Sequence, residues 1–155
     1  MADYNISLSE GFSLVTVHGA PADLCFVSSL FEALAGQNIN VDMISQSPPQ
    51  GSFSPVSFTI SDAKLPACLE ILAKLREANP AIRPVVCHQN YKVLVTGEKM
   101  RNTPGVAAEV FKAAAHAAVD VRLVTTAETE ISLLIAEGNR NAFLTELEEI
   151  LCSKK

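Results

Sequence analysis

The feature that most constrains this chain is an internal repeat with a spacing of 80 residues. Phe31 and Phe111 occupy equivalent positions 80 residues apart, and so do Leu30 and Val110. A repeat at a fixed spacing indicates that one supersecondary unit is used twice, each copy with its own apolar face to bury. The 155 residues therefore predict two modules of roughly 70 to 80 residues, enough in total to fold without metal or disulfide staples.

The first module is predicted from helical and alternating apolar patterns. A helical stripe runs through Val27, Leu30, Phe31 and Leu34, and Gly36 follows it where a left-handed helix end is expected. A second stripe recurs at the leucines from 65 to 75, after two alternating segments. The expected strands are 12–17, 39–44, 55–60 and 82–87, and together with the helices they predict the order βαββαβ.

The second module repeats this order, with strands expected at 91–96, 119–125 and 130–136. Thr103 and Pro104 are expected to open its first helix, as a capping hydroxyl and a proline at the first helical position. No strand is expected after the last helix, so the alternating segment 4–8 is predicted to complete this second sheet. The fold class is therefore α+β: two ferredoxin-like βαββαβ modules in tandem, at 12–88 and at 3–9 plus 91–152.

Composition excludes several classes of function. The formal net charge is -5 and tryptophan is absent, which argues against a nucleic-acid surface, because such a surface needs clustered positive charge and stacking rings. No apolar run approaches the about 20 residues that cross a bilayer, and no secretory signal is visible, so we expect a cytoplasmic location and no membrane contact. The four cysteines lack metal-ligand spacing, so we expect reduced thiols, no metal site and no cofactor.

Two groups of short motifs resemble the tandem ACT regulatory domains of aspartate kinases. In the first half they are the run Asn40-Val41-Asp42-Met43 and Gln46. In the second half they are Gly97, Met100, the run Pro104-Gly105-Val106, Glu128, and Ile131-Ser132. The resemblance covers almost the whole chain. It implies two ACT modules of the aspartate kinase type without the kinase domain, in agreement with the predicted repeat.

The function of this family follows from the resemblance alone. Its ACT pairs bind an amino-acid effector, commonly threonine or lysine, between modules of associated chains, and they relay occupancy to a kinase. The resemblance therefore implies an allosteric, amino-acid binding regulatory domain of amino-acid biosynthesis. It also implies a homodimer, with a kinase subunit as a candidate partner.

The binding residues follow from the same resemblance and have a physical rationale. A strand-to-helix turn presents unpaired helix amides with partial positive charge to an α-carboxylate, and amide side chains on a neighbouring strand can bind the rest of the ligand. The residues implied in this way are Ala20, Ala22, Asp23, Leu24, Cys25, Asn40 and Gln46 in the first module, and Asn102, Thr103, Pro104, Gly105, Asp120 and Val121 in the second.

The chain departs from the family pattern in both modules. Where the family has Asp-x-Pro-Gly, residues 22–25 read Ala-Asp-Leu-Cys, and Asp120-Val121 stands where Asn-Ile is usual. These departures leave a second hypothesis open, in which the chain is a ligand-free ACT module for assembly or dimerisation that interacts with a partner enzyme. A thiol-dependent activity at Cys25 is a third reading.

Catalysis by this chain is not expected. It contains no Gly-Gly pair and no Walker-type loop, and the catalytic domain of the family would need a further segment before Met1. His18, His88 and His116 have no paired carboxylate or nucleophile in a recognisable arrangement, so we expect surface or packing histidines. The sequence therefore predicts a regulatory domain without catalytic residues.

Overall fold

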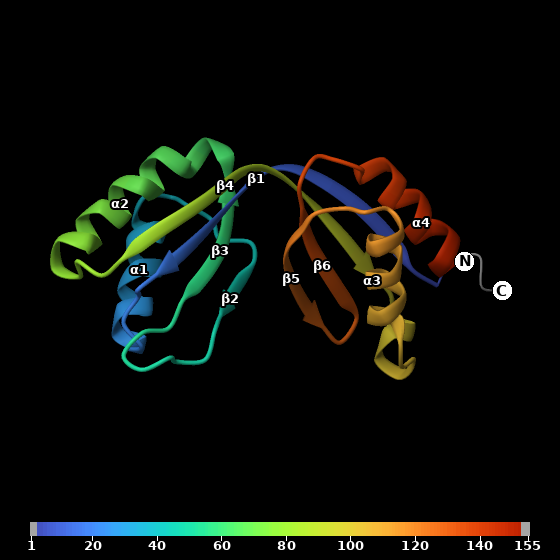
Figure 1. The fold of residues 1–155 in the computed structure, drawn as a ribbon, viewed down its shortest axis with the longest axis horizontal. Helices are drawn as coiled ribbons and strands as arrows, with labels where there is room; N and C mark the ends of the chain where they lie inside the picture. The colour runs from blue at the N-terminus through green and yellow to red at the C-terminus, as the bar shows by residue number, and fades with distance from the viewer. Residues whose placement is uncertain (1–2, 153–155) are drawn as a thin grey trace. The chain divides into compact units, whose positions relative to one another are not determined.

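The computed structural model describes residues 3–152, and the chain divides into two compact units. Module 1 is Gly11–Gln89, and module 2 combines the residues up to Glu10 with those from Asn90 onward. Strands β1 (Asn5–His18) and β4 (Arg83–Thr96) each contribute residues to both units (Figure 1). Each module is therefore described by itself.

Module 1 has two helices and four strand segments in the order predicted for a ferredoxin-like unit. The β3 strand pairs antiparallel with both β1 and β2, and the strands lie in the order β2-β3-β1-β4. A short 3-10 turn at Asp62–Lys64 leads into the second helix. The remaining elements are α1 (Leu24–Gly36), β2 (Ile44–Gln46), β3 (Val56–Ser61) and α2 (Leu65–Ala78).

The core of module 1 lies between the strands and the two helices (Figure 1). Val15, Val17 and Phe58 on the strands and Leu30 on α1 are fully buried. Phe31 packs edge-on against Phe58, with the ring centroids 5.7 Å apart. Alternate strand residues face the helices, as the period-2 pattern predicted.

Module 2 repeats the architecture. The β6 strand pairs antiparallel with β4 and β5, and the strands lie in the order β1-β4-β6-β5. The N-terminal part of β1 thus completes this sheet, which confirms the predicted fold class. The elements are a 3-10 turn at Glu98–Asn102, α3 (Val106–His116), β5 (Val121–Ala127), β6 (Glu130–Ile135) and α4 (Arg140–Cys152).

The second strand of module 1 begins later than predicted, at Ile44 rather than at residue 39. Two successive residues oppose Thr59 here: its carbonyl accepts from the Asp42 amide at 3.0 Å, and its amide donates to the Met43 carbonyl at 3.0 Å. The Met43 amide donates to the Thr59 hydroxyl at 2.9 Å instead of to a strand carbonyl. This two-against-one arrangement interrupts the regular ladder, so the predicted strand 39–44 is wrong in its bounds.

Two predicted helix ends also differ from the structure. The left-handed residue after α1 is Asn38, with φ of 56°, and not Gly36; asparagine is among the residues that tolerate this conformation. The first helix of module 2 begins at Val106, and its N-cap is Gly105 with φ of 95° and no capping side chain. Thr103 therefore lies outside the helix and does not cap it.

In the part of the chain that the structure describes, no helix is long and apolar enough to cross a membrane.

Candidate functional site

The strand-to-helix turn of module 1 is paired with another segment of its own chain. The Ala22 amide donates to the Ser52 carbonyl at 2.9 Å, and the Ser54 amide donates to the Ala20 carbonyl at 2.9 Å. Pro21 and Phe53 form a bridge between these two bonds. The β2–β3 loop, residues 47–55, thus lies along the turn and occupies backbone groups that would otherwise be available to a ligand.

Asp23 is the N-cap of α1. Its Oδ1 accepts a hydrogen bond from the Cys25 amide at 2.9 Å, and its backbone carbonyl accepts from the Phe26 amide at 3.1 Å. The carboxylate thus satisfies one of the helix amides that a ligand carboxylate would need. Leu24, 76% exposed, and the exposed Cys25 follow it in the first turn.

Gln46 is linked to the same turn through a buried serine. Its Nε2 donates to Ser54 Oγ at 3.3 Å, and that hydroxyl donates to the Ser47 carbonyl at 2.6 Å. Because Ser54 also donates its amide to Ala20, it connects β2 to the turn, and it is 1% exposed. Ser54 could not be predicted from the sequence, because nothing there distinguishes it from the other serines of this loop.

Asn40 is not brought together with the turn. The turn precedes α1, whereas Asn40 follows its other end, and a helix of 13 residues is about 20 Å long. Along β3, Gln46 pairs with Val56 near the turn, while the segment just after Asn40 bonds to Thr59. The exposed Asn40 side chain therefore belongs to a different region of module 1.

The corresponding turn of module 2 is open. Residues 102–105 are exposed, and Gly105 has φ of 95° with no atom within 4 Å of the position that a Cβ would occupy. The Thr103 amide donates to the Met100 carbonyl at 3.3 Å, so this turn is held by the preceding 3-10 turn. The positive φ is the conformation that glycine adopts at little cost, which explains Gly105.

A cavity of about 260 Å³ adjoins the start of α3. One side is formed by the turn and the first helical residues, and the other by the β5–β6 hairpin. Arg101 and Glu128, both exposed, form an ion pair at this place. The lining residues are Met100, Thr103, Gly105, Val106, Ala107, Thr126, Ala127, Glu128 and Ile131.

The chemistry of this cavity matches a zwitterion. The amino-terminal amides of α3 carry partial positive charge and favour an α-carboxylate, and the Glu128 carboxylate favours an ammonium group. A second cavity of about 310 Å³ shares Thr103, Gly105 and Val106 with the first and extends toward Glu109 and Leu151. The open turn of module 2 is therefore bounded by two hollows.

Asp120 and Val121 do not lie at this turn. They follow the carboxyl end of α3, and Val121 pairs with Ile135, whereas Ala127, at the other end of β5, lies in the cavity lining. Asp120 Oδ2 lies 3.1 Å from Arg122 Nη2. The hairpin residues Thr126 and Glu128 lie at the turn of module 2 instead. Thr126 lies 80 residues after Gln46, so the repeat spacing could have predicted its place at the site.

The structure also locates the remaining candidate side chains. His116 Nδ1 lies 3.3 Å from Glu146 Oε2, and both side chains are partly exposed. Within residues 3–152, no group of three histidine, cysteine, aspartate or glutamate side chains is placed to hold a metal ion. All four cysteines are free thiols; Cys25 and Cys152 are exposed, and Cys68 is buried.

Comparisons with known proteins give consistent results. The family model described as ACT domain matches residues 93–149. An aspartokinase of Geobacillus stearothermophilus is 33% identical over 144 residues, which are 93% of this chain and 34% of that protein. This chain spans about a third of the length of the curated relatives that it matches.

Two solved structures have nearly the same extent as this chain. The regulatory subunit of aspartate kinase from Thermus thermophilus, in a ligand-free form, is 26% identical with a TM-score of 0.85, and the match covers 94% of this chain and 95% of that one. The regulatory subunit of aspartate kinase from Thermus flavus is 25% identical with a TM-score of 0.86, covering 97% and 99% of the two chains. The similarity thus lies with the regulatory part of these enzymes.

Proposed function

We propose, from the premise that this chain is a pair of ACT modules of the aspartate kinase regulatory type, that it binds an amino-acid effector and relays occupancy to a kinase partner. Threonine, lysine or a similar amino acid is the proposed effector class, and a homodimer is the proposed assembly. The proposed modules are 12–88 and 3–9 plus 91–152. The matched regulatory subunits of aspartate kinase support this reading.

The observation that carries the proposal is the open cavity at the start of α3. Its volume of about 260 Å³ suits a small ligand. The amides at the start of α3 and the Glu128 carboxylate, which also pairs with Arg101, are complementary to the two charges of an amino acid. The α-carboxylate binds at the amides of Val106 and Ala107, and the ammonium group binds Glu128. Thr103 and Thr126 then contact the side chain of the effector as hydrogen-bonding groups.

Regulation requires that the effector bind two arrangements of the protein unequally. An effector shifts an equilibrium only by its differential affinity for the two states. The cavity joins a helix start to a hairpin, so a ligand that bonds both elements favours the arrangement in which they are close. The kinase partner senses the change as a population shift in the regulatory pair.

A second function is favoured by module 1, and it is an assembly module without a ligand. The turn of module 1 is already bonded to Ser52 and Ser54 of its own chain, so its Ala20 carbonyl and Ala22 amide are occupied. Ile44, 52% exposed, lies on the strand at the edge of the module 1 sheet. An exposed strand edge with an apolar side chain is suited to pairing with another chain.

A thermal-shift screen against the twenty amino acids, followed by calorimetry, tests the effector proposal. Saturation at about 100 times the Kd adds about 2.7 kcal/mol of stability, which is a shift of several degrees for a protein of this size. We expect one amino acid, or a few related ones, to give this shift. Absence of a shift across the panel, in a well-folded dimer, would favour the assembly function.

Matched variants then locate the effector site. Glu128→Gln removes the proposed ammonium partner and is expected to weaken binding about tenfold, because a charged hydrogen bond is lost. Glu148→Gln makes the same charge change at an exposed position on α4, and it should alter the Kd less than about twofold. An unchanged Kd in Glu128→Gln, with a tenfold loss in Glu109→Gln, would move the effector to the second cavity.

A further inference from the structure

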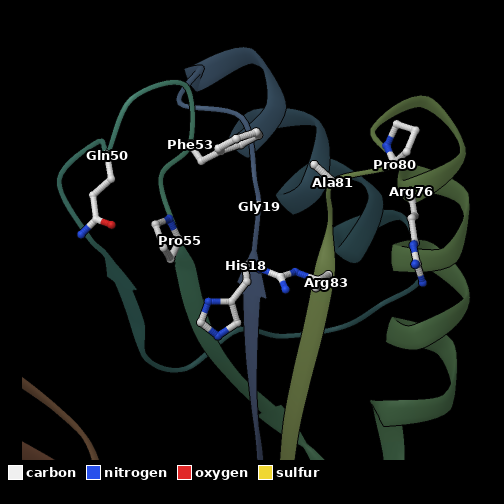
Figure 2. A pocket seen from close by; sticks show the side chains of 9 residues that line it. All are labelled: His18, Gly19, Gln50, Phe53, Pro55, Arg76, Pro80, Ala81 and Arg83. Atoms are coloured by element: carbon white, nitrogen blue, oxygen red, sulfur yellow. The ribbon is translucent and has the colours of Figure 1, made fainter.

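Module 1 contains a larger hollow that the effector proposal does not use. It has a volume of about 500 Å³ and lies where β1 ends, β4 begins and α2 ends (Figure 2). His18 and Arg83 reach it from the two strands, and Arg76 reaches it from the last turn of α2. Figure 2 shows the Arg83 side chain extending from β4 toward His18 on β1, its neighbouring strand.

The charges of this hollow are all basic. Residues 11–89 contain two arginines, Arg76 and Arg83, and both line it. The same residues contain six acidic side chains, yet none of them is among the residues that line the hollow. In a module with an acidic balance, both guanidinium groups and one imidazole thus line the same hollow, with Arg83 extended toward His18 and Arg76 lying along α2 (Figure 2).

Neither guanidinium group, that of Arg76 or that of Arg83, is paired with a carboxylate in the part of the chain that the structure describes. An anion bound in the hollow would supply the counter-charge that both groups lack. The helix dipole accounts for a cation in the last turn of α2, at Arg76, but it gives no reason for Arg83 or His18.

The strand positions explain why His18 and Arg83 share one face of the sheet. Val17 and Ile82, which precede them, are fully buried toward the core, so the next residue on each strand points to the opposite face. Close passage of the chain also shapes the hollow: a Cβ at Gly19 would lie 2.0 Å from the Ala81 carbonyl oxygen. The backbone therefore forms one wall.

Apolar side chains complete the hollow. Phe53, Pro55 and Pro80 line it beside the basic groups (Figure 2). A ligand that combines an anionic group with a carbon skeleton can therefore place each part against matching chemistry. Guanidinium groups bind carboxylate and phosphate oxygens with two parallel hydrogen bonds, so both anions fit the donors present.

We propose that this hollow binds a small organic dianion, carrying either a phosphate group or two carboxylates, with Arg83, Arg76 and His18 as its anchors. This ligand is distinct from the zwitterionic effector, whose single carboxylate is balanced by its own ammonium group. Module 1 then senses a second metabolite class, although its strand-to-helix turn is closed. The two modules respond to different chemistry.

Amide NMR titration and calorimetry at fixed ionic strength test the proposal with three probes: inorganic phosphate, succinate and acetate. We expect phosphate, succinate or both to bind and to shift the amide signals of residues 18–19 and 81–83. The anion that binds more tightly shows whether the ligand carries a phosphate group or two carboxylates. Acetate should bind at least about tenfold more weakly, because it carries one charge. Equal binding of acetate, or no shift by either dianion, overturns the proposal.

Variants separate specific binding from general attraction. Arg83→Gln should weaken dianion binding at least about tenfold, and Arg83→Lys should restore part of it, since the charge returns without the planar fork. Lys74→Gln, two residues before Arg76 and exposed on α2, removes one charge outside the hollow and should change the Kd less than about twofold. Equal losses in Arg83→Gln and Lys74→Gln would overturn the proposal.

Discussion

The two strand-to-helix turns of this chain occupy equivalent places in the repeat but are used differently. In module 1, the turn is bonded to the β2–β3 loop through Ala20 and Ala22. In module 2, the equivalent turn borders a cavity, and its N-cap Gly105 has open space on the side where a Cβ would lie. One fold can therefore present the same helix start either closed by its own chain or open to a ligand.

The length of one loop explains the difference. In module 1, residues 47–55 connect β2 to β3, and this loop is long enough to reach the turn. In module 2, only residues 128–129 connect β5 to β6. The hairpin therefore ends beside the turn, and the cavity between them stays open. Loop length thus accounts for the bonded turn of module 1 and the open turn of module 2, because the order of helices and strands is the same in both modules.

The largest expected effect is at Gly19, which directly follows β1 and precedes the turn of module 1, and it is compared with Gly105, the N-cap of α3 in module 2. Gly19→Ala places a Cβ 2.0 Å from the Ala81 carbonyl oxygen at a positive φ of 68°, so we expect a loss of about 3 kcal/mol or more. Gly105→Ala has the positive φ without the collision, so we expect about 1 kcal/mol. Urea unfolding of both variants measures this contrast, and equal losses would contradict it.

A smaller effect is expected at the serine that closes the turn of module 1. Ser54→Ala removes the hydroxyl that bonds the Ser47 carbonyl and Gln46, and we expect a loss of about 1 to 2 kcal/mol. Ser52→Ala, in the same loop, removes an exposed side chain and leaves its carbonyl bond to Ala22, so it should cost less than about 0.5 kcal/mol. If chemical denaturation gives the reverse order, the hydroxyl does not hold the loop.

Helix capping should differ between the modules by about 1 kcal/mol. Asp23→Ala removes the side chain that caps α1, with an expected loss of that size. Thr103→Ala should have almost no effect on stability, since α3 has Gly105 as its N-cap and no capping side chain. Melting temperatures of the two variants, compared with the parent protein, distinguish them; a large loss in Thr103→Ala would show that the threonine stabilises the turn.

The last expected effect is the ionisation of the buried Cys68 thiol in module 1, which does not change stability at neutral pH. Burial raises the pKa of Cys68 from 9.0 to about 11, so the folded protein keeps this proton to higher pH than the unfolded chain does. Its contribution to stability is complete below pH 9 and is lost as the pH rises from about 9 to about 11. Cys68→Ala should therefore lose less stability than the parent over this interval in pH-dependent unfolding.

Labelling with a thiol reagent compares the buried thiol of module 1 with an exposed thiol of module 2. The exposed Cys152 on α4 of module 2 should react rapidly in the native protein, whereas Cys68 on α2 should react only after unfolding. Rapid native labelling of Cys68 would mean that the α2 face opens readily and that its thiol is not held in the core.

The sequence was sufficient to predict the architecture because the architecture depends on local patterns. The stripe through Leu30 and Leu34 and the alternation at Val15 and Val17 are direct consequences of helix and strand periodicity. The 80-residue repeat then required both modules to share one order. The strand at 39–44 was misplaced because the Thr59 hydroxyl, on another strand, takes the Met43 amide.

The candidate sites were less predictable because they depend on contacts between distant residues. Asp23 could be placed at a helix start from sequence, but the sequence did not show that its carboxylate bonds the Cys25 amide. The loop bonds from Ser52 and Ser54 to the turn also have no local signature. Arg76 and Arg83 line the same hollow only because α2 ends beside β4.

The most direct test of the central claim is amide NMR titration with the amino acid that the thermal screen identifies. We expect the amide signals of residues 103, 105–107 and 126–128 to shift and saturate together, while the signals of residues 22–25 and Gln46 do not shift. A saturable response confined to residues 22–25 and Gln46 would contradict the central claim, because the closed turn of module 1 would then be the effector site.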